Sequence, residues 1–117
     1  MGVRHACISP GARNSSLTYA FTEKSKITCY SHVDERSSAF FGLGLAKSTQ
    51  KPVVLISTSG TAPANFYPAV IEASLSRVPL IILSADRPNY LVGTGANQTI
   101  DQQNLYGIHV RYFADVG

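Results

Sequence analysis

Four short apolar segments recur at regular intervals along the chain, each separated from the next by a polar, helix-compatible segment. They are Val3–Ile8, Ile27–Tyr30, Val53–Ile56 and Leu80–Leu83. Their starts lie about 25 residues apart, which is the length that a strand, a helix of about three turns and two short loops need. The spacing therefore predicts four β-strands that alternate with helices.

The segments between the strands have the apolar periodicity of helices. It favours helices over Ser15–Glu23, Asp34–Ser48 and Ala62–Leu75, and more weakly over Asp101–Tyr106. Pro68 should kink or break the third of them. Strands that are apolar throughout suit a parallel sheet covered on both sides. We therefore expect an α/β fold with a doubly wound, mostly parallel sheet and helices on both faces.

Length and composition predict a single domain. The chain has 117 residues, of which 44% are hydrophobic and 15% charged, and this is enough for one modest core. Lys and Arg are scattered and form no basic run, so the net charge of +3 favours small anions and argues against nucleic acid. The strand at the start and the abrupt end after 110–113 suggest a fragment of a longer, multidomain protein.

Cysteine usage and hydropathy indicate the cellular compartment that the protein occupies. Cys7 and Cys29 lack the Cys-x-x-Cys spacing of a metal or redox site, and two cysteines are too few for a disulfide scaffold. We expect both thiols to be buried and reduced, as in a cytoplasmic protein. The chain has no long uncharged apolar stretch, so no membrane insertion is expected. The three histidines have no metal-ligand spacing, and no metal site is predicted.

Polar residues of unusual type follow the strands and do not precede them. Ligands of parallel α/β sheets bind beyond the carboxyl ends of the strands. The segments after the four strands are 9–14, 32–36, 57–61 and 86–88. The segments before the later strands, 24–26, 49–51 and 77–79, have the composition of ordinary solvated turns. The sequence thus predicts a binding site at one edge of the sheet.

Glu35 stands at the head of the apolar stripe of the second predicted helix. The stripe continues four, seven, eight and eleven residues later, at Ala39, Gly42, Leu43 and Ala46. A half-buried acid at this position suggests a catalytic or binding role. The alternative is that Asp34 caps the helix and Glu35 only complements the helix dipole. Gly42 and Gly44 lie inside the helix and suggest close helix-to-sheet packing.

The other polar loops each have two interpretations. Ser57–Thr61 could bind an anion or a carbonyl oxygen through backbone N–H groups, or could be a Ser/Thr N-cap with a turn glycine. It lacks the Gly-Lys-Ser/Thr ending of a Walker A loop. Arg13 and Arg87 could bind carboxylates of an acidic substrate, although Arg87 could instead pair with Asp86 or cap a helix.

The segment Asn89–Gln98 contains two glycines and two amides near its end. It is either a binding loop, with Asn97 and Gln98 donating hydrogen bonds to a ligand, or a plain surface excursion.

Taken in order, these loops resemble the N-terminal pyrimidine-binding (PYR) domain of thiamine diphosphate enzymes. Within that superfamily they are most similar to the 2-succinyl-5-enolpyruvyl-6-hydroxy-3-cyclohexene-1-carboxylate synthases, the MenD family. The motifs that carry the resemblance span nearly the whole chain: Ile8-Ser-Pro-Gly-Ala-Arg-Asn-Ser15, His32-Val-Asp-Glu-Arg-Ser37, Gly42-Leu-Gly-Leu-Ala-Lys47, Thr58-Ser-Gly-Thr-Ala62, Ala64-Asn65, Ala85-Asp-Arg-Pro88 and Gly95-Ala-Asn-Gln98.

The resemblance implies a carboligase of menaquinone biosynthesis that joins isochorismate to the succinyl-semialdehyde unit left when 2-oxoglutarate loses carbon dioxide. It implies that Glu35 hydrogen-bonds N1′ of the cofactor's aminopyrimidine ring, which requires a carboxyl group shielded from water. It places Thr58 and Gly60 against that ring. It also implies that two arginines and two amides bind the isochorismate side: Arg13, Arg87, Asn97 and Gln98.

Two departures from the family pattern bear on these expectations. Family members usually have Ser where this chain has Ala12, so one hydroxyl contact to substrate is lost. Nothing here matches the Gly-Asp-Gly…Asn motif with which these enzymes hold Mg²⁺ and the diphosphate in another domain, usually of another subunit. We therefore expect the parent enzyme to be a homodimer or homotetramer, and residues 1–117 alone to bind cofactor weakly and to be inactive.

Two alternatives to this function stay open. The chain could be the PYR domain of another thiamine diphosphate-dependent 2-oxo acid decarboxylase or carboligase, with different substrates. It could also be a non-catalytic α/β domain that binds anions or a protein partner, with Glu35 acting only on the helix dipole.

Overall fold

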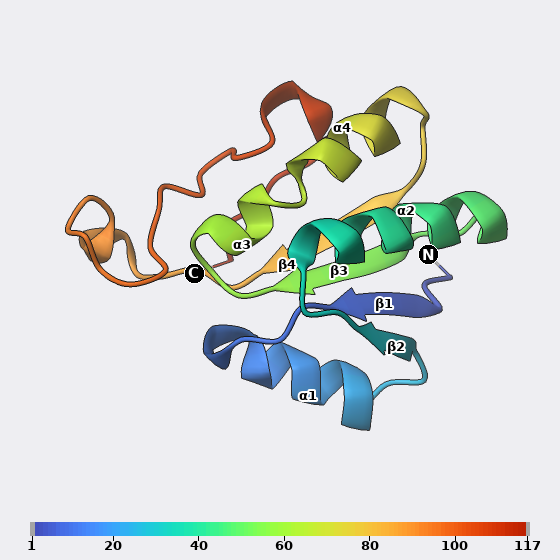
Figure 1. The fold of residues 1–117 in the computed structure, drawn as a ribbon, viewed down its shortest axis with the longest axis horizontal. Coiled ribbons are helices and arrows are strands. Elements are labelled where there is room, and N and C mark those ends of the chain that lie inside the picture. Colours follow the sequence, from blue (N-terminus) through green and yellow to red (C-terminus); the bar gives the residue numbers. More distant parts are fainter. Residues whose placement is uncertain (1, 117) are drawn as a thin grey trace.

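The fold is a parallel sheet with strand order β2-β1-β3-β4. A computed structural model describes residues 2–116 of the chain. Its strands are β1 (His5–Ile8), β2 (Thr28–Ser31), β3 (Val53–Ser57) and β4 (Leu80–Ser84), and Figure 1 shows them side by side. Every strand pair is parallel, which confirms the predicted sheet type.

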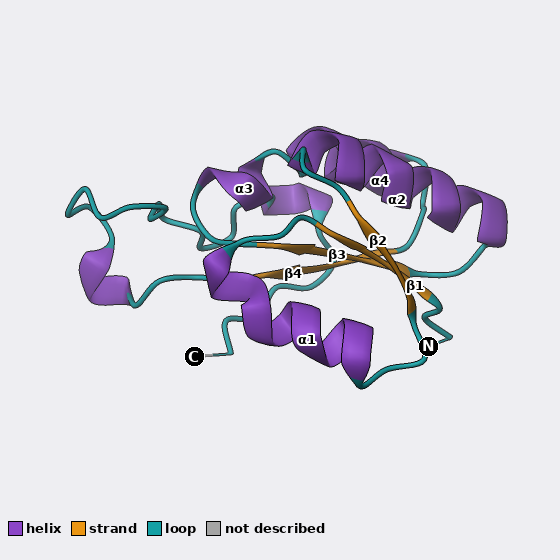
Figure 2. Cartoon of the chain, turned by 60° about the horizontal axis from the view of Figure 1, so that its bottom comes forward, coloured by secondary structure: helices purple, strands orange, loops and turns teal. Residues whose placement is uncertain are grey.

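Helices cover both faces of this sheet. Figure 2 shows α1 (Ser15–Glu23) on one face and α2 (Glu35–Thr49), α3 (Thr61–Ala64) and α4 (Tyr67–Leu75) on the other. Alternate strand residues supply two cores, one around Leu55 on the α2 and α4 side and one around Ile56 on the α1 side. All five residues of β3 are buried because this strand is covered on both sides. The doubly wound α/β prediction is therefore confirmed.

The strand register brings the carboxyl ends of the strands to one edge. Ile8 pairs with both Ser31 and Ile56, and Ser57 pairs with Ser84. The four polar segments that follow the strands consequently start from the same side of the sheet, as the sequence pattern predicted.

The first two predicted helices form almost as expected. α1 has the predicted bounds, and α2 begins at Glu35 because Asp34 serves as its N-cap. The Asp34 carboxylate accepts a hydrogen bond of 2.7 Å from the Ser37 backbone N–H. Gln50 ends α2 in the left-handed region, with φ of 55°.

The third predicted helix is two helices, and the break lies before Pro68. α3 ends at Ala64 and α4 begins at Tyr67, which places Pro68 in the first turn of α4. A proline is tolerated there because N–H groups of the first turn have no partner within the helix. The break was expected, but Pro68 lies in the first turn of the second helix, after the break, and does not interrupt that helix.

The predicted helix over Asp101–Tyr106 is wrong. This segment forms turns, followed by a short 3₁₀ helix, η3 (Gly107–His109). Asn104 has a φ of 51°, a left-handed conformation that a right-handed helix cannot include. The apolar pair Leu105 and Tyr106 packs against the core around Leu55 without a helical stripe.

The close packing expected at two glycines and the burial expected for two cysteines are each found at only one of the two residues. A Cβ at Gly42 would lie 2.6 Å from Cδ2 of Leu55, so Gly42 does allow α2 to approach the sheet. Gly44 is exposed and no atom lies within 4 Å of the position its Cβ would take, so the packing role predicted for it is wrong. Both cysteines are free thiols, but only Cys7 is buried, and Cys29 at the sheet edge is half-buried.

Candidate site at the carboxyl edge of the sheet

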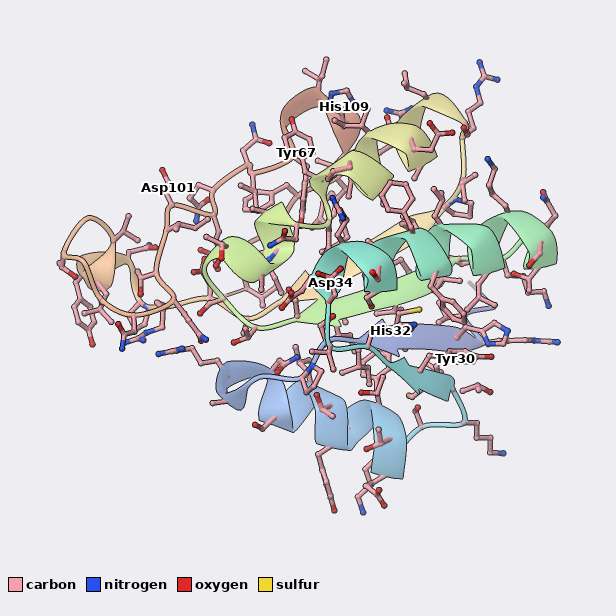
Figure 3. The ribbon with its side chains drawn as sticks, viewed as in Figure 1. Tyr30, His32, Asp34, Tyr67, Asp101 and His109 are labelled. Atoms are coloured by element: carbon pink, nitrogen blue, oxygen red, sulfur yellow. The ribbon has the colours of Figure 1, made fainter. Side chains whose placement is uncertain are left out.

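Aromatic contacts fix the junction between β2 and α2, from which Glu35 projects. The rings of Tyr30 and His32 lie 5.1 Å and 4.8 Å from that of Phe41 one to two turns into α2. Figure 3 shows Tyr30, His32 and Asp34 following one another along this junction. The His32 backbone N–H also donates to Ile8 O at 2.9 Å, which extends the β1 pairing to the junction.

Asp34 and Glu35 are adjacent carboxylates with different surroundings. Asp34 is exposed and its carboxylate is committed to the Ser37 N–H, a hydrogen bond that lowers the pKa of Asp34 below its usual value. Glu35 is half-buried, and no hydrogen bond or ion pair of its carboxylate occurs among residues 2–116. The capping role predicted for Asp34 is confirmed, and it leaves the Glu35 carboxylate available to a ligand.

The loop after β3 is buried and packs against the loop after β1. Ser57, Thr58 and Ser59 are at most 6% exposed. A Cβ at Gly11 would lie 2.6 Å from Cβ of Thr58, so only glycine permits this approach between the two loops. The structure therefore brings Thr58 beside the segment that carries Arg13.

Gly60 links the same loop to the segment after β4. Its φ of 82° lies in the left-handed region, and a Cβ there would come within 2.8 Å of the Gln98 backbone. Ser59 Oγ donates to Gln98 O at 2.7 Å. Gly60 itself is the N-cap of α3, with no side-chain cap, so the alternative of a Ser/Thr cap for this loop is wrong.

The two candidate arginines converge on the two candidate amides. Arg13 donates from Nη1 to Oε1 of Gln98, and Arg87 donates from Nη1 to Asn97 O at 3.1 Å. The Asp86 carboxylate accepts the Arg87 backbone N–H at 2.7 Å and does not bind its guanidinium. The four residues predicted to hold a carboxylate substrate thus form one cluster, and both arginines are half-buried in it.

Buried polar atoms without a partner gather in the segments around this edge. They are Ser9 Oγ, Asn14 Oδ1, His32 Nδ1, Ser38 Oγ and Thr58 Oγ1; two further such atoms among the described residues, His5 Nδ1 and Thr18 Oγ1, lie in β1 and α1. Asn14 uses its Nδ2 to donate to Ser9 O at 2.9 Å, so its Oδ1 is the unsatisfied half of the amide. Buried polar groups normally have a partner. Unsatisfied atoms on the segments after β1 and β3 and in the first turns of α2 therefore fit a site built for a polar ligand.

Two residues of this edge escaped the sequence analysis. Gln102 is 7% exposed and bonds to the loops after β3 and β4, and Ser59 ties the first of these loops to Gln98. A lone glutamine in a segment without clear periodicity carries no sequence signal of such a role. Ser59 lay in a segment singled out for its backbone, and its hydroxyl contact depends on a residue 39 positions away.

The rest of the described chain gives weaker evidence of a functional site. Residues 2–116 contain no group of three or more His, Cys, Asp or Glu side chains placed to hold a metal ion. None of the described helices is long and apolar enough to cross a membrane. A groove of about 1010 Å³ lies between β4, α4 and residues 109–116, but its walls are mainly apolar.

Comparisons with known proteins identify the family of the chain. The family model for the N-terminal TPP binding domain of thiamine pyrophosphate enzymes matches residues 1–105. Two curated relatives, both named 2-succinyl-5-enolpyruvyl-6-hydroxy-3-cyclohexene-1-carboxylate synthase, are 56% identical over 115 residues: those of Lysinibacillus sphaericus and Haloarcula marismortui. The match covers 98% of this chain but only 20% and 19% of these relatives, so the chain spans about a fifth of their length.

Among solved structures, benzoylformate decarboxylase from Polynucleobacter necessarius has the same fold. The TM-score is 0.76 at 20% sequence identity, over 92% of this chain and 20% of that chain. From the family match together with the curated relatives, we conclude that the chain belongs to the N-terminal TPP binding domain family of thiamine pyrophosphate enzymes.

Proposed function

We propose that this domain works within a MenD-type synthase, which condenses isochorismate with 2-oxoglutarate, releases carbon dioxide and forms 2-succinyl-5-enolpyruvyl-6-hydroxy-3-cyclohexene-1-carboxylate. The support is the identity of 53–56% to relatives that bear this enzyme's name, over nearly the whole chain. The product belongs to menaquinone biosynthesis, so we place the parent protein among the cytoplasmic transferases that supply it.

The observation that carries the proposal is the half-buried, unpartnered carboxylate of Glu35 at the start of α2. Bound thiamine diphosphate supplies a thiazolium carbon that becomes nucleophilic once it loses its proton. The part of Glu35 is to hold a proton in a hydrogen bond to N1′ of the pyrimidine ring. A carboxyl group does this better when its surroundings exclude water, because the hydrogen bond is then stronger.

The loop after β3 would form the wall of the pyrimidine site. Thr58 has a buried hydroxyl without a partner, and Gly60 holds the loop in a left-handed turn against the Gln98 backbone. We propose that these two residues lie against the ring. Ser57, Thr58 and Ser59 are buried, and a well-packed wall suits the placement of a cofactor ring.

The arginine and amide cluster would bind the carboxylates of isochorismate. Arg13 and Arg87 are already oriented by Gln98 and Asn97 respectively, and guanidinium groups bind carboxylates through paired hydrogen bonds. Ala12 adds no hydroxyl beside Arg13, so the arginine carries this contact without the help of a serine.

The remaining parts of the enzyme lie outside residues 1–117. We propose that Mg²⁺ and the diphosphate are held by another domain and that the active enzyme is a homodimer or homotetramer, with the site between subunits. Residues 1–117 alone would then bind cofactor weakly and catalyse nothing.

The direct test is to supply the full-length protein with thiamine diphosphate, Mg²⁺, 2-oxoglutarate and isochorismate and to identify the product by mass spectrometry. We expect 2-succinyl-5-enolpyruvyl-6-hydroxy-3-cyclohexene-1-carboxylate, with release of one carbon dioxide per product. Replacing isochorismate by pyruvate or an aldehyde serves as the acceptor control. Turnover only with such other acceptors would favour a different carboligase, and no calorimetric binding of millimolar cofactor would contradict a thiamine-dependent role.

A further inference from the structure

Gln102 occupies the junction between two loops of the proposed site. Its Oε1 accepts the Gly60 backbone N–H at 2.8 Å, and its Nε2 donates to Ala85 O at 3.1 Å and to Ser84 Oγ at 3.4 Å. One side-chain amide therefore bonds to the loop after β3 through its oxygen and to the end of β4 through its nitrogen. The side chain is only 7% exposed, so water cannot readily replace these bonds.

The two loops that Gln102 joins serve different parts of the proposed site. Gly60 follows Thr58 and Ser59 in the wall assigned to the cofactor's pyrimidine ring. Ala85 precedes the Asp86–Arg87 pair, and Arg87 in turn holds Asn97 O at 3.1 Å. The oxygen of Gln102 thus faces the cofactor side, while its nitrogen faces the side assigned to isochorismate.

These hydrogen bonds can fix the position of the loop at Gly60 relative to the loop at Ala85. Gly60 has no Cβ, so its backbone could adopt many conformations besides the observed one, in which φ is 82°. Its N–H needs a partner because the residue is buried. An amide can satisfy an N–H and a carbonyl oxygen at once, whereas a carboxylate only accepts and an apolar side chain does neither.

From these contacts we propose that Gln102 is a positioning residue, which couples the cofactor loop at Gly60 to the acceptor loop at Ala85–Arg87 and so determines affinity for the isochorismate carboxylates. This proposal rests on the function proposed above for the same site. Gln102 touches neither substrate in this scheme and acts through Gly60 and Arg87.

Two substitutions in the full-length protein separate its two bonds. Gln102→Met has a similar length and removes both. Gln102→Glu keeps an oxygen for the Gly60 N–H but, when ionised, has no donor for Ala85 O. We expect Gln102→Glu to raise KM for isochorismate about tenfold near neutral pH with little change in cofactor affinity, and Gln102→Met to weaken the binding of both.

The pH profile of Gln102→Glu distinguishes positioning from a general loss of structure. Burial raises the pKa of a carboxyl group, and the protonated acid can again donate to Ala85 O. KM for isochorismate should therefore fall toward the original value as the pH is lowered. The charged side chains next to these contacts, Asp86, Arg87 and Asp101, are also present in the unmodified protein. Its KM for isochorismate should not show this fall as the pH is lowered.

Gln103 provides the matched control because it is exposed and its side chain bonds only to Asp115 among the described residues. Gln103→Glu and Gln103→Met make the same chemical changes one position away. Both should leave KM, cofactor affinity and the pH profile unchanged.

Hydrogen exchange followed by mass spectrometry gives a readout that does not need activity. In Gln102→Met the peptides containing Gly60 and residues 85–98 should exchange faster, while those of α1 and α2 keep their original rates. Equal exchange in these peptides, or a lower kcat with unchanged KM values in both variants, would overturn the proposal. An unmodified enzyme that does not use isochorismate would refute the proposed function alone, and the exchange data would still decide the role of Gln102.

Discussion

At the scale of single residues, the adjacent pair Asp34 and Glu35 shows how position divides two similar side chains between two roles. Asp34 precedes the helix in an extended conformation, from which its carboxylate reaches the Ser37 N–H. Glu35 is the first helical residue, so its Cα–Cβ bond tilts toward the N-terminal end of the helix. One carboxylate therefore holds the helix start, and the other can act on a ligand.

The cap at Asp34 predicts a pH-dependent contribution to stability. The pKa of Asp34 is lowered in the folded protein, so its contribution is present above the ordinary Asp pKa of about 4 and is lost as the pH falls through the lowered value. Asp34→Ala should reduce the melting temperature at pH 7 by a few degrees. Thermal denaturation from pH 7 to pH 3 should show the difference between the two proteins shrinking with the pH.

Asp34→Asn is the control for this experiment, since an amide oxygen still accepts the Ser37 N–H without the charge. It should retain most of the stability and lose the pH dependence. A difference between Asp34→Ala and the unmodified protein that stays constant down to pH 3 would show that the carboxylate charge does not contribute through this bond.

At the scale of secondary-structure elements, α2 is the helix that places the proposed site over the sheet. It packs on β1 and β3 through a stripe of small and aliphatic side chains, and its close approach depends on Gly42. The sequence predicted this helix well because its apolar period and its acidic start agree. The split between α3 and α4 was harder to place, since Pro63 and Pro68 both suit first turns, and the fully buried Phe66 at the boundary has no sequence signal that marks it as a helix end.

Gly42 and Gly44 allow a direct test of this packing. Gly42→Ala should lower the free energy of unfolding by about 1–3 kcal/mol, because the new methyl group overlaps Leu55 in a packed core. Gly44→Ala should raise it by up to about 1 kcal/mol, because its position is open and alanine favours the helix. Urea denaturation of the two variants measures both effects. Equal effects of the same sign would contradict the proposed contact between α2 and β3.

At the scale of the whole molecule, four polar segments meet at one edge because four parallel strands end there in register. This follows from topology, so the sequence could predict the location of the candidate site and the presence of Arg13 and Arg87 there, whereas only the family resemblance implied that Asn97 and Gln98 join them. The sequence could not predict that Gln98 accepts from Arg13 or that Gln102 joins two loops. Those contacts depend on the path of residues 89–104, whose turns have no hydrophobic period.

We propose Glu35 as the proton-holding carboxyl group of a thiamine diphosphate site, and its substitution by glutamine tests this role most directly. Glutamine keeps the size of the side chain but has no carboxyl group that can take up or release a proton near neutral pH. In the full-length protein, thiamine-dependent decarboxylation of 2-oxoglutarate with isochorismate present is the measurement. The control is Glu23→Gln, which makes the same change at an exposed position at the end of α1.

We expect Glu35→Gln to lower kcat by a factor of about 10² or more, in the range typical of a lost general acid–base group. Glu23→Gln should leave the rate unchanged. Undiminished turnover in Glu35→Gln would contradict the role of Glu35 and, with it, the account of this edge as half of a thiamine diphosphate site.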